Sequence, residues 1–455
     1  MTLPGAFVDV LPLGVTFGSA IFSNFYSREN RRQSYAIGLL GGLFVYFTYI
    51  FFTRDFNTSL AVHSFFDIRY NKISVFVAAL FCGSLFLGLY PSRRTVTLSE
   101  SFLFYIAGGL GIILSNNLPT FFLFWLFQRC LPAVTIVRDA VTNSTYGGAT
   151  YLKQHLMALT CFVLLLYFAS LRGLLVTPMT EMPVTFFTWP VLLLAFIIIY
   201  QSHGLFPFHS WVHDMVGSFA WYETASVFLS RAGVLLFVQF LLPTLKTDPS
   251  SFKILILSLS ILSSVYWSFR GLSEETPVRA TTYFYVAQSS LLLTGLQADA
   301  VAVKGSYLHM MVISISGAGL FSILDYIKHS FGLERASRHL GLAQYYPKLS
   351  TLFCLFGFCM IGVPLGASFV VEDLVITGIL DYQPLLGLGH IFATCLNGIL
   401  FFLIYSRLFL GKNPFKDVVV NKDMPLGQML PYLIGLVLLI LIGILPYLFL
   451  EKLTW

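Results

Sequence analysis

Long apolar runs separated by short polar loops follow one another along the whole chain. An α-helical membrane crossing needs about 20 mostly apolar residues, and only helices or closed barrels satisfy their backbone hydrogen bonds in lipid. The runs have helical length, and about fourteen of them can be counted. The predicted spans are 7–25, 35–53, 73–90, 100–115, 117–137, 155–171, 187–217, 220–243, 253–269, 280–297, 305–327, 349–380, 384–410 and 428–450. The pattern predicts an all-α polytopic membrane protein.

Two of these runs, 187–217 and 349–380, are too long for one straight crossing. The first is interrupted by Gly204 and Pro207, and the second by Pro364 and Gly366. Glycine and proline at such places predict broken helices. Because unwinding frees backbone carbonyls and amides, a broken membrane helix persists only where it lines a polar cavity. We therefore expect the two breaks to mark functional regions.

Composition supports the membrane prediction and narrows the chemistry. The 455 residues are 57% hydrophobic and 11% charged, and the mean hydropathy of +0.80 lies far above that of soluble domains. No polar linker divides the chain, so 1–455 is interpreted as one transmembrane domain. The six cysteines show no metal-binding spacing, and no GxGxxG motif follows a strand. We expect no metal and no cofactor.

Basic residues predict the orientation. The formal net charge of +6 comes from lysines and arginines scattered through short loops, which argues against nucleic-acid binding. When the loops are assigned alternately to the two sides, most basic residues collect on one side, which is the cytoplasmic one by the positive-inside rule. Both termini are then expected on the outer side of the cytoplasmic (inner) membrane. Two basic residues, Arg129 and Arg231, lie within predicted spans and are assigned to neither side.

Ionisable residues inside the spans are the candidate functional groups. A charge at the bilayer centre costs a few kcal/mol even on lenient scales, so such residues usually face a bundle interior and mark an ion route. Each one alone could instead make a helix–helix hydrogen bond or reach the interface. Their recurrence at the two broken helices favours function. The five clusters are Arg129, the stretch 203–214, Glu223 with Arg231, His309, and Glu372 with Asp373.

Several segments resemble one known superfamily. "SHGLFPFHSWVHD" (202–214), followed by "SRAGVLLFVQF", resembles the motif of the antiporter-like proton-channel subunits of respiratory complex I, which is shared with Mrp-type antiporters and the membrane subunit of DAB-type inorganic-carbon pumps. "HMMVISISGAGLF" and "PLGASFVVEDL" resemble the family's eleventh and broken twelfth helices. The resemblance spans about residues 100–410. It implies fourteen helices with two inverted five-helix repeats, here about 100–243 and 253–410.

The family's charged positions carry over only in part. The resemblance implies a midplane axis of lysines and acids, and the acid of the twelfth helix is present as Glu372. The lysine of the eighth helix falls on Arg231, and that of the broken seventh helix falls on Ser202, beside His203. The acid of the fifth helix is missing, and Arg129 stands near its place. Because arginine keeps its charge at any working pH, Arg231 can act only as a fixed positive charge.

These departures lead to a predicted path and a predicted charge pair. Histidine has a reference pKa of about 6.5 and can relay protons near neutral pH. The second half, with His309 and Glu372, keeps more titratable groups, so we expect proton conduction there first. In the first half we expect Arg129 to be held by Glu223 or Asp214. The predicted path residues are Glu372, His309, His203, Arg231 and Glu223.

Three functions remain open from the sequence. The first is a proton-translocating subunit that couples proton or cation flux to partner subunits, in a complex-I-like or DAB-like assembly. The second is a degenerate, non-pumping scaffold that docks other membrane subunits, which Arg231 and the missing fifth-helix acid favour. The third is a stand-alone transporter for an organic solute. In the first two, other membrane or peripheral subunits are the expected partners, and any redox chemistry belongs to them.

Overall fold

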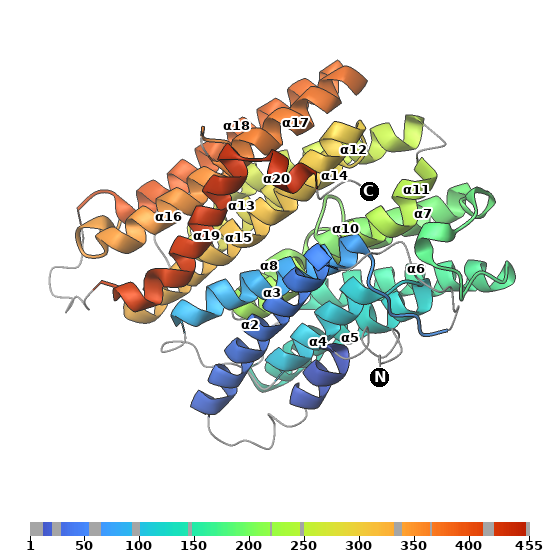
Figure 1. The fold of residues 1–455 in the computed structure, drawn as a ribbon, viewed down its shortest axis with the longest axis horizontal. Helices are drawn as coiled ribbons and strands as arrows, with labels where there is room; N and C mark the ends of the chain where they lie inside the picture. Colours follow the sequence, from blue (N-terminus) through green and yellow to red (C-terminus); the bar gives the residue numbers. More distant parts are fainter. Residues whose placement is uncertain are drawn as a thin grey trace. The chain divides into compact units, whose positions relative to one another are not determined.

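The structure is a computed structural model, and it describes residues 12–20, 29–53, 65–92, 101–143, 148–218, 221–245, 250–331, 339–364, 366–412 and 423–451. Within these residues the regular structure is helical, apart from two isolated β-bridges that pair Ile68 with Ser115 and Asn117 with Pro178. Figure 1 shows long helices running side by side in each part of the molecule. The all-α prediction is confirmed.

The helices follow the predicted spans in order. The first predicted span, 7–25, is described only at 12–20, which is helical. The helices are α2 (Glu29–Thr53), α3 (Lys72–Ser92), α4 (Phe102–Leu114), α5 (Leu118–Asn143), α6 (Ala149–Leu171), η2 (Met179–Glu181), η3 (Val184–Phe186), α7 (Trp189–His203), α8 (Trp211–Ser218), α9 (Trp221–Leu229), α10 (Ala232–Leu236), η4 (Phe237–Leu241), α11 (Leu242–Leu245), α12 (Ser250–Leu272), α13 (Pro277–Ser290), α14 (Leu292–Gly295), α15 (Ala300–Phe331), η5 (Leu342–Gln344), α16 (Pro347–Met360), α17 (Ala367–Tyr382), α18 (Pro384–Phe409), α19 (Leu426–Ile444) and α20 (Tyr447–Leu450).

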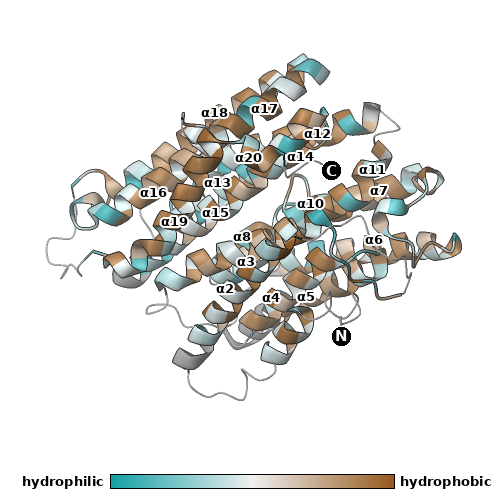
Figure 2. Cartoon of the chain, in the orientation of Figure 1, coloured by the Kyte–Doolittle hydropathy of each residue, from teal (hydrophilic) through white to brown (hydrophobic). Residues whose placement is uncertain are grey.

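Helix length and apolar surface fit a membrane environment. Within the described ranges, eight helical spans are long and apolar enough to cross a bilayer, and four shorter apolar helices accompany them. The shorter ones include α7 and α16, the first parts of the two predicted broken helices. Large apolar side chains such as Val45, Trp189 and Leu385 are more than half exposed. Figure 2 shows apolar residues along most of the helices. The protein is embedded in the membrane as a multi-pass helical protein.

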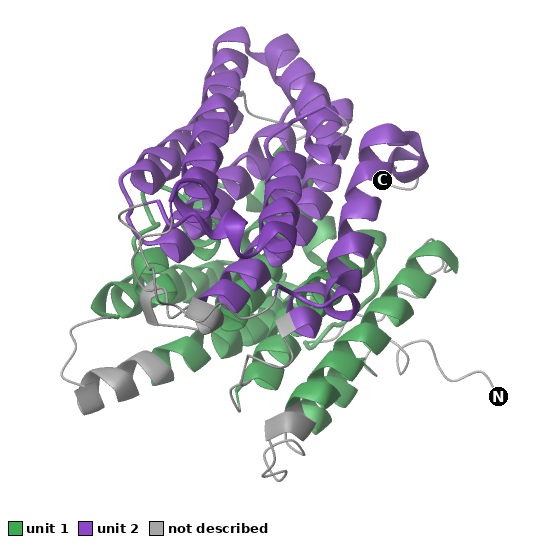
Figure 3. Cartoon of the chain, turned by 90° about the vertical axis from the view of Figure 1, so that its left-hand side faces the viewer, with its two compact units in different colours: residues 1–86, 96–248 green, residues 87–95, 249–455 purple. Residues whose placement is uncertain are grey.

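The chain divides into two compact units, residues 1–86 with 96–248 and residues 87–95 with 249–455 (Figure 3). In the first unit, α4 packs on α5, and α7 packs on both α6 and α10. In the second unit, α12 packs on α13 and α18, and α15 packs on α17. That the units are inverted repeats stays a prediction.

Both predicted helix breaks are present, and two more interruptions were not predicted. The α7–α8 break contains Gly204 and Pro207, and the α16–α17 break contains Pro364 and Gly366. The eighth span, predicted as one helix, is interrupted at Arg231 and continues through a π-helical turn, η4. The tenth span is likewise interrupted between α13 and α14.

Candidate functional site

The break of the first unit begins where α7 ends. Gly204 adopts a left-handed conformation with φ of 74°, which glycine tolerates best. Its N–H bonds to Gln201 O at 3.2 Å, and Leu205 N–H bonds to Tyr200 O at 2.9 Å, a pattern typical of a helix C-terminus. The chain then leaves the helix axis, and the carbonyls of the last turn of α7 face other helices.

The eighth span packs directly against this end of α7. A Cβ on Gly233 of α10 would lie 2.6 Å from Ile199 O and 2.9 Å from His203 Cβ. Real Cβ atoms do not approach so closely, so glycine at 233 permits the contact between the helices. His203 is buried at 3% exposure. The predicted path residue therefore lies inside the packed core of the first unit.

Arg129 on α5 binds the carbonyl end of α7. Its side chain is 2% exposed, and Nη2 donates to Ser202 O at 3.0 Å. The guanidinium carbon lies 5.2 Å from the centroid of the Trp211 ring, at the start of α8. The C-terminus of a helix carries a partial negative charge, and an aromatic face attracts a cation. Arg129 thus places a fixed positive charge at the break.

The expected charge pair of Arg129 is replaced by these neutral contacts. Among the described residues, Arg129 forms no ion pair with Asp214 or Glu223. Asp214 Oδ2 instead accepts a hydrogen bond from Tyr151 N–H at 3.0 Å, at the start of α6. The reason is local, because a carboxylate is stabilised by the free amides of a helix N-terminus. Asp214 therefore anchors α8 to α6.

A cluster of aromatic rings surrounds Arg129 and includes a histidine that the sequence analysis did not single out. His155 stacks on Tyr151 at 3.8 Å between centroids and lies edge-on to Trp211 at 5.1 Å. Its Nδ1 donates to Tyr151 O at 2.8 Å. Tyr151 OH in turn donates to Arg129 O at 3.1 Å. The spacing of Tyr151 and His155 by four residues was the available signal, since it places both on one helix face.

Arg231 occupies the second interruption of the first unit. It is 1% exposed and has φ 53° and ψ 31°, in the left-handed region. Such a conformation is rare and costly for a residue other than glycine, and it clusters at functional sites. Glu223, eight residues earlier on α9, is also buried, at 9% exposure. Both predicted residues thus lie in the interior.

The break of the second unit holds a carboxylate. Glu372 is half-buried on α17, and its Oε1 accepts a hydrogen bond from Ser368 Oγ at 3.3 Å. Ser368 Oγ also lies 3.1 Å from Met360 O, the last residue of α16. A Cβ on Gly362, which has φ 73°, would collide with the Glu372 carboxyl group. Glu372 therefore lies directly against the unwound segment.

His309 belongs to the helix that packs along this break. It is 2% exposed on α15, one turn after Gly305. A Cβ on Gly305 would lie 3.0 Å from side-chain atoms of Leu374 and Val375 on α17. Residues four apart share a helix face, so His309 lies on the face of α15 that packs against α17. Asp373, by contrast, is exposed.

The second unit contains a further polar group that the sequence analysis missed. His390 on α18 is 1% exposed, and its Nδ1 lies 3.1 Å from Thr294 Oγ1 of α14. Thr294 Oγ1 donates to Leu291 O at 2.6 Å, which leaves His390 Nδ1 as the donor. Asn397, two turns on, donates to Ser264 Oγ of α12 at 3.2 Å. The available signal was the seven-residue spacing of His390 and Asn397, which places both polar side chains on one face of a helix.

The fold and these two breaks define a class: a multi-pass helical membrane protein with charged groups at interrupted helices, the arrangement from which ion and solute pathways are built. The family model described as NADH:quinone oxidoreductase/Mrp antiporter, transmembrane, matches residues 115–397. This chain belongs to that family.

The relatives are distant in sequence and close in fold. NADH-quinone oxidoreductase subunit M of Rickettsia felis is 22% identical over 448 residues, covering 90% of this chain and 88% of the relative. A chain of the archaeal membrane-bound sulfane sulfur reductase superposes with a TM-score of 0.85 at 18% identity, over 98% of this chain and 77% of that one. A chain of respiratory complex I from Thermus thermophilus gives 0.79 at 17% identity, over 99% and 100%.

Proposed function

We propose that this chain is a proton-translocating, antiporter-like subunit of a multi-subunit membrane complex, and that it couples proton or cation flux to its partner subunits. The observation that carries the proposal is the Glu372 carboxyl group, which lies against the unwound segment between α16 and α17. It does so in a chain whose family match covers residues 115–397. A titratable group at unwound backbone is what a proton path through a membrane requires.

In this proposal the second unit conducts. Glu372 takes up and releases the proton at the break, and Ser368 orients the carboxyl group by its 3.3 Å hydrogen bond. His309 on α15 is the next relay, since an imidazole exchanges protons near neutral pH. The backbone groups freed by the break are solvated by water, which completes the path between titratable groups.

The first unit supplies fixed charge in this proposal. Arg129 and Arg231 keep their protons at working pH, so neither carries one across the membrane. Arg129 holds the carbonyl end of α7, and its field acts on His203 and Glu223 in the same unit. Protons or cations entering the first unit are repelled by these guanidinium groups, which directs flux to the second unit.

The test is proton flux into proteoliposomes that contain the purified full chain, under an imposed membrane potential. Glu372→Gln is expected to reduce flux at least tenfold, because the amide cannot take up the proton. His309→Ala is expected to reduce it by a smaller factor. Asp373→Asn is the matched control, since Asp373 neighbours Glu372 but is exposed. Equal flux in wild type, Glu372→Gln and His309→Ala would remove the proposed route.

A non-pumping scaffold is the second candidate. It is favoured by Arg129, which occupies the carbonyl end of α7 with a charge that cannot titrate. A scaffold conducts no protons in proteoliposomes, yet its loss prevents assembly of the complex. Flux equal to that of empty liposomes, together with loss of the partner subunits in a deletion strain, would favour this candidate.

We infer further that the complex is respiratory and complex-I-like or a DAB-like inorganic-carbon pump, and that the chain lies in the cytoplasmic membrane with both termini outside. The proteins that co-purify with the chain test the first point: quinone- and cluster-binding subunits indicate respiration, and a soluble zinc protein indicates carbon uptake. Reporter fusions to the two termini test the orientation, because a periplasm-active reporter should work at both.

A further inference from the structure

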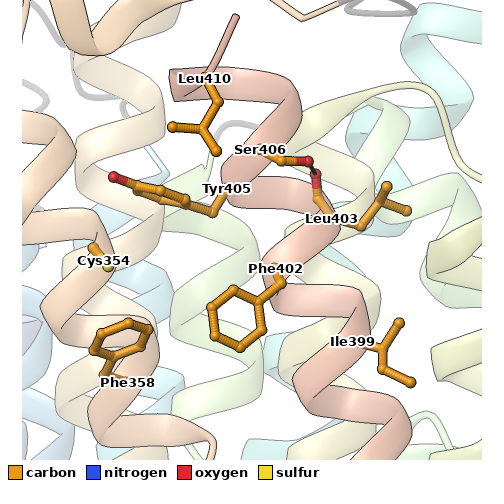
Figure 4. Close-up of a pocket in the computed structure, with 8 residues that line it drawn as sticks. All are labelled: Cys354, Phe358, Ile399, Phe402, Leu403, Tyr405, Ser406 and Leu410. Atoms are coloured by element: carbon orange, nitrogen blue, oxygen red, sulfur yellow. Dashed lines mark hydrogen bonds between the residues drawn. The ribbon is translucent and has the colours of Figure 1, made fainter.

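An apolar groove lies on the second unit, between α16 and α18. Its volume is about 520 Å³, within the range of about 300–1,000 Å³ typical of ligand sites. Cys354 and Phe358 form the α16 wall, and Ile399, Phe402 and Leu410 belong to the α18 wall. Figure 4 shows these side chains on the two facing helices. The groove belongs to neither of the helix breaks described above.

The groove follows one stripe of α18 and faces outward. Ile399, Phe402 and Leu410 are 57%, 51% and 48% exposed. From residue 399 to residue 410 the helix rises about 16 Å, at about 1.5 Å per residue. This is about half of a hydrocarbon core of about 30 Å. The groove therefore has the length of one membrane leaflet.

One end of the groove is polar and basic. His339 Nδ1 donates to Ser406 O at 2.8 Å, which places the imidazole at the last turn of α18. Arg407 donates from Nη1 to Glu274 O at 2.7 Å, so its guanidinium group lies near the end of α12 and does not line the groove. Lys412, two residues beyond Leu410, is exposed. The positive-inside assignment puts this end at the cytoplasmic surface.

The charge at this end stays positive after the nearby acid is counted. Asp423 Oδ2 accepts the backbone N–H of Lys348 at 2.8 Å, and Lys348 Nζ lies 3.5 Å from Met424 O. Beside the groove, the basic residues His339, Lys348 and Lys412 therefore outnumber Asp423, whereas Arg407 lies beside Glu274 and Glu275. Basic residues at the cytoplasmic end of a groove between membrane helices attract anionic lipid headgroups.

We propose that this groove binds an anionic phospholipid of the cytoplasmic leaflet, with one acyl chain between α16 and α18 and the phosphate beside Lys412 and His339. The apolar walls contact the methylene groups of the chain, and the Lys412 ammonium group donates charge-assisted hydrogen bonds to the phosphate. The site is independent of the proton path through Glu372.

The basic end of the groove distinguishes an anionic lipid from a partner helix, because the apolar walls alone could contact either. A helix of another subunit is therefore treated as an outcome of the test below.

The first measurement is native mass spectrometry of the purified full chain, exposed to equal amounts of dioleoyl phosphatidylglycerol and dioleoyl phosphatidylcholine. We expect the phosphatidylglycerol adduct to predominate about tenfold. Lys412→Gln should lower that preference about fivefold, the equivalent of ~1 kcal/mol per basic residue. Lys153→Gln, at an exposed lysine of α6, is the matched control and should leave it unchanged.

The second measurement uses two native cysteines as reporters, and substitutions at the same positions complement it. Cys354 lines the groove, and Cys395 is exposed elsewhere on α18. Phosphatidylglycerol should slow N-ethylmaleimide alkylation of Cys354 at least fivefold and phosphatidylcholine less, with Cys395 unaffected by either. Cys354→Phe should remove the bound lipid, whereas Cys395→Phe should not.

Three results would overturn the proposal. Equal protection of Cys354 by the two lipids would show that the basic end selects no headgroup. Protection by neither would show that no lipid enters the groove. If Cys354 stays protected from alkylation in the intact complex after its lipids have been removed, a partner subunit occupies the groove.

Discussion

The two units place different side chains at their helix breaks, a guanidinium group in the first unit and a carboxyl group in the second. At the end of α7, Arg129 donates to the Ser202 carbonyl, where a helix C-terminus is negative. Near the start of α17, Glu372 lies against the unwound segment and accepts a hydrogen bond from Ser368 Oγ. The α7 break therefore has a charge that its helix end favours, whereas Glu372 is held by a side-chain contact. The difference is that a carboxylate can release and take up a proton, and a guanidinium cannot.

In the proposed function, the titratable carboxyl group lies in the conducting unit and the guanidinium group in the other unit. The residue type decides whether the group at the break titrates. Arg129 contacts the α7 break through Ser202 O and the Trp211 ring. Glu372 depends on the small residue Gly362 for its position. Four substitutions test this difference between Glu372 and Arg129.

Gly362→Ala should have the largest effect. The left-handed φ of 73° costs an alanine about 1–2 kcal/mol, and the new Cβ would collide with the Glu372 carboxyl group. Proton flux in proteoliposomes should fall at least tenfold although Glu372 is present. Gly398→Ala is the control, because nothing lies within 4 Å of a Cβ at 398. Wild-type flux in Gly362→Ala would show that the position of Glu372 is irrelevant to conduction.

Arg129→Met should destabilise the first unit without reducing flux. It leaves the Ser202 carbonyl without its charged donor, a loss of about 2–3 kcal/mol. Arg129→Lys should recover about half of the loss, since an ammonium keeps the charge but not the planar contact with Trp211. The Tm of the purified chain and its proteoliposome flux measure the two effects. A large loss of flux with unchanged Tm would place the conducting route in the first unit.

Gly233→Ala tests the packing of α10 on the end of α7. A Cβ there would lie 2.6 Å from Ile199 O, and overpacking of this kind costs about 1–3 kcal/mol. A lowered Tm is expected, measured beside Gly42→Ala, whose new Cβ would meet nothing within 4 Å. Equal Tm values for the two variants would mean that α10 and α7 accommodate the extra methyl group with no loss of stability.

Ser368→Ala should have the smallest effect. It removes the hydroxyl shared by Met360 O and Glu372 Oε1, a loss of about 1 kcal/mol. Flux should fall a few-fold because the carboxyl group loses its orienting bond. Ser368→Thr keeps the hydroxyl and should restore most of the flux; failure to restore it would exclude hydrogen bonding as the cause.

The sequence predicted the helices and the two main breaks because their causes are local. A run of about 20 apolar residues forms a helix in lipid whatever surrounds it. Gly204 interrupts such a run by its left-handed conformation, and Pro364 does so because it has no backbone N–H. The interruptions at Arg231 and Leu291 were missed, since neither residue breaks a helix by type. Packing imposes φ 53° on Arg231.

Repeated membrane crossings, ionisable residues inside the spans and two broken helices all follow from the residues of this chain. Desolvation cost and backbone conformation belong to single residues and their neighbours. Which groups contact one another depends on the tertiary structure. Arg129 donates a hydrogen bond to the carbonyl of Ser202, 73 residues away, and does not pair with Asp214. His390 is hydrogen-bonded to Thr294, 96 residues away. Such partners depend on which helices pack together, and helix packing cannot be predicted from a local sequence pattern.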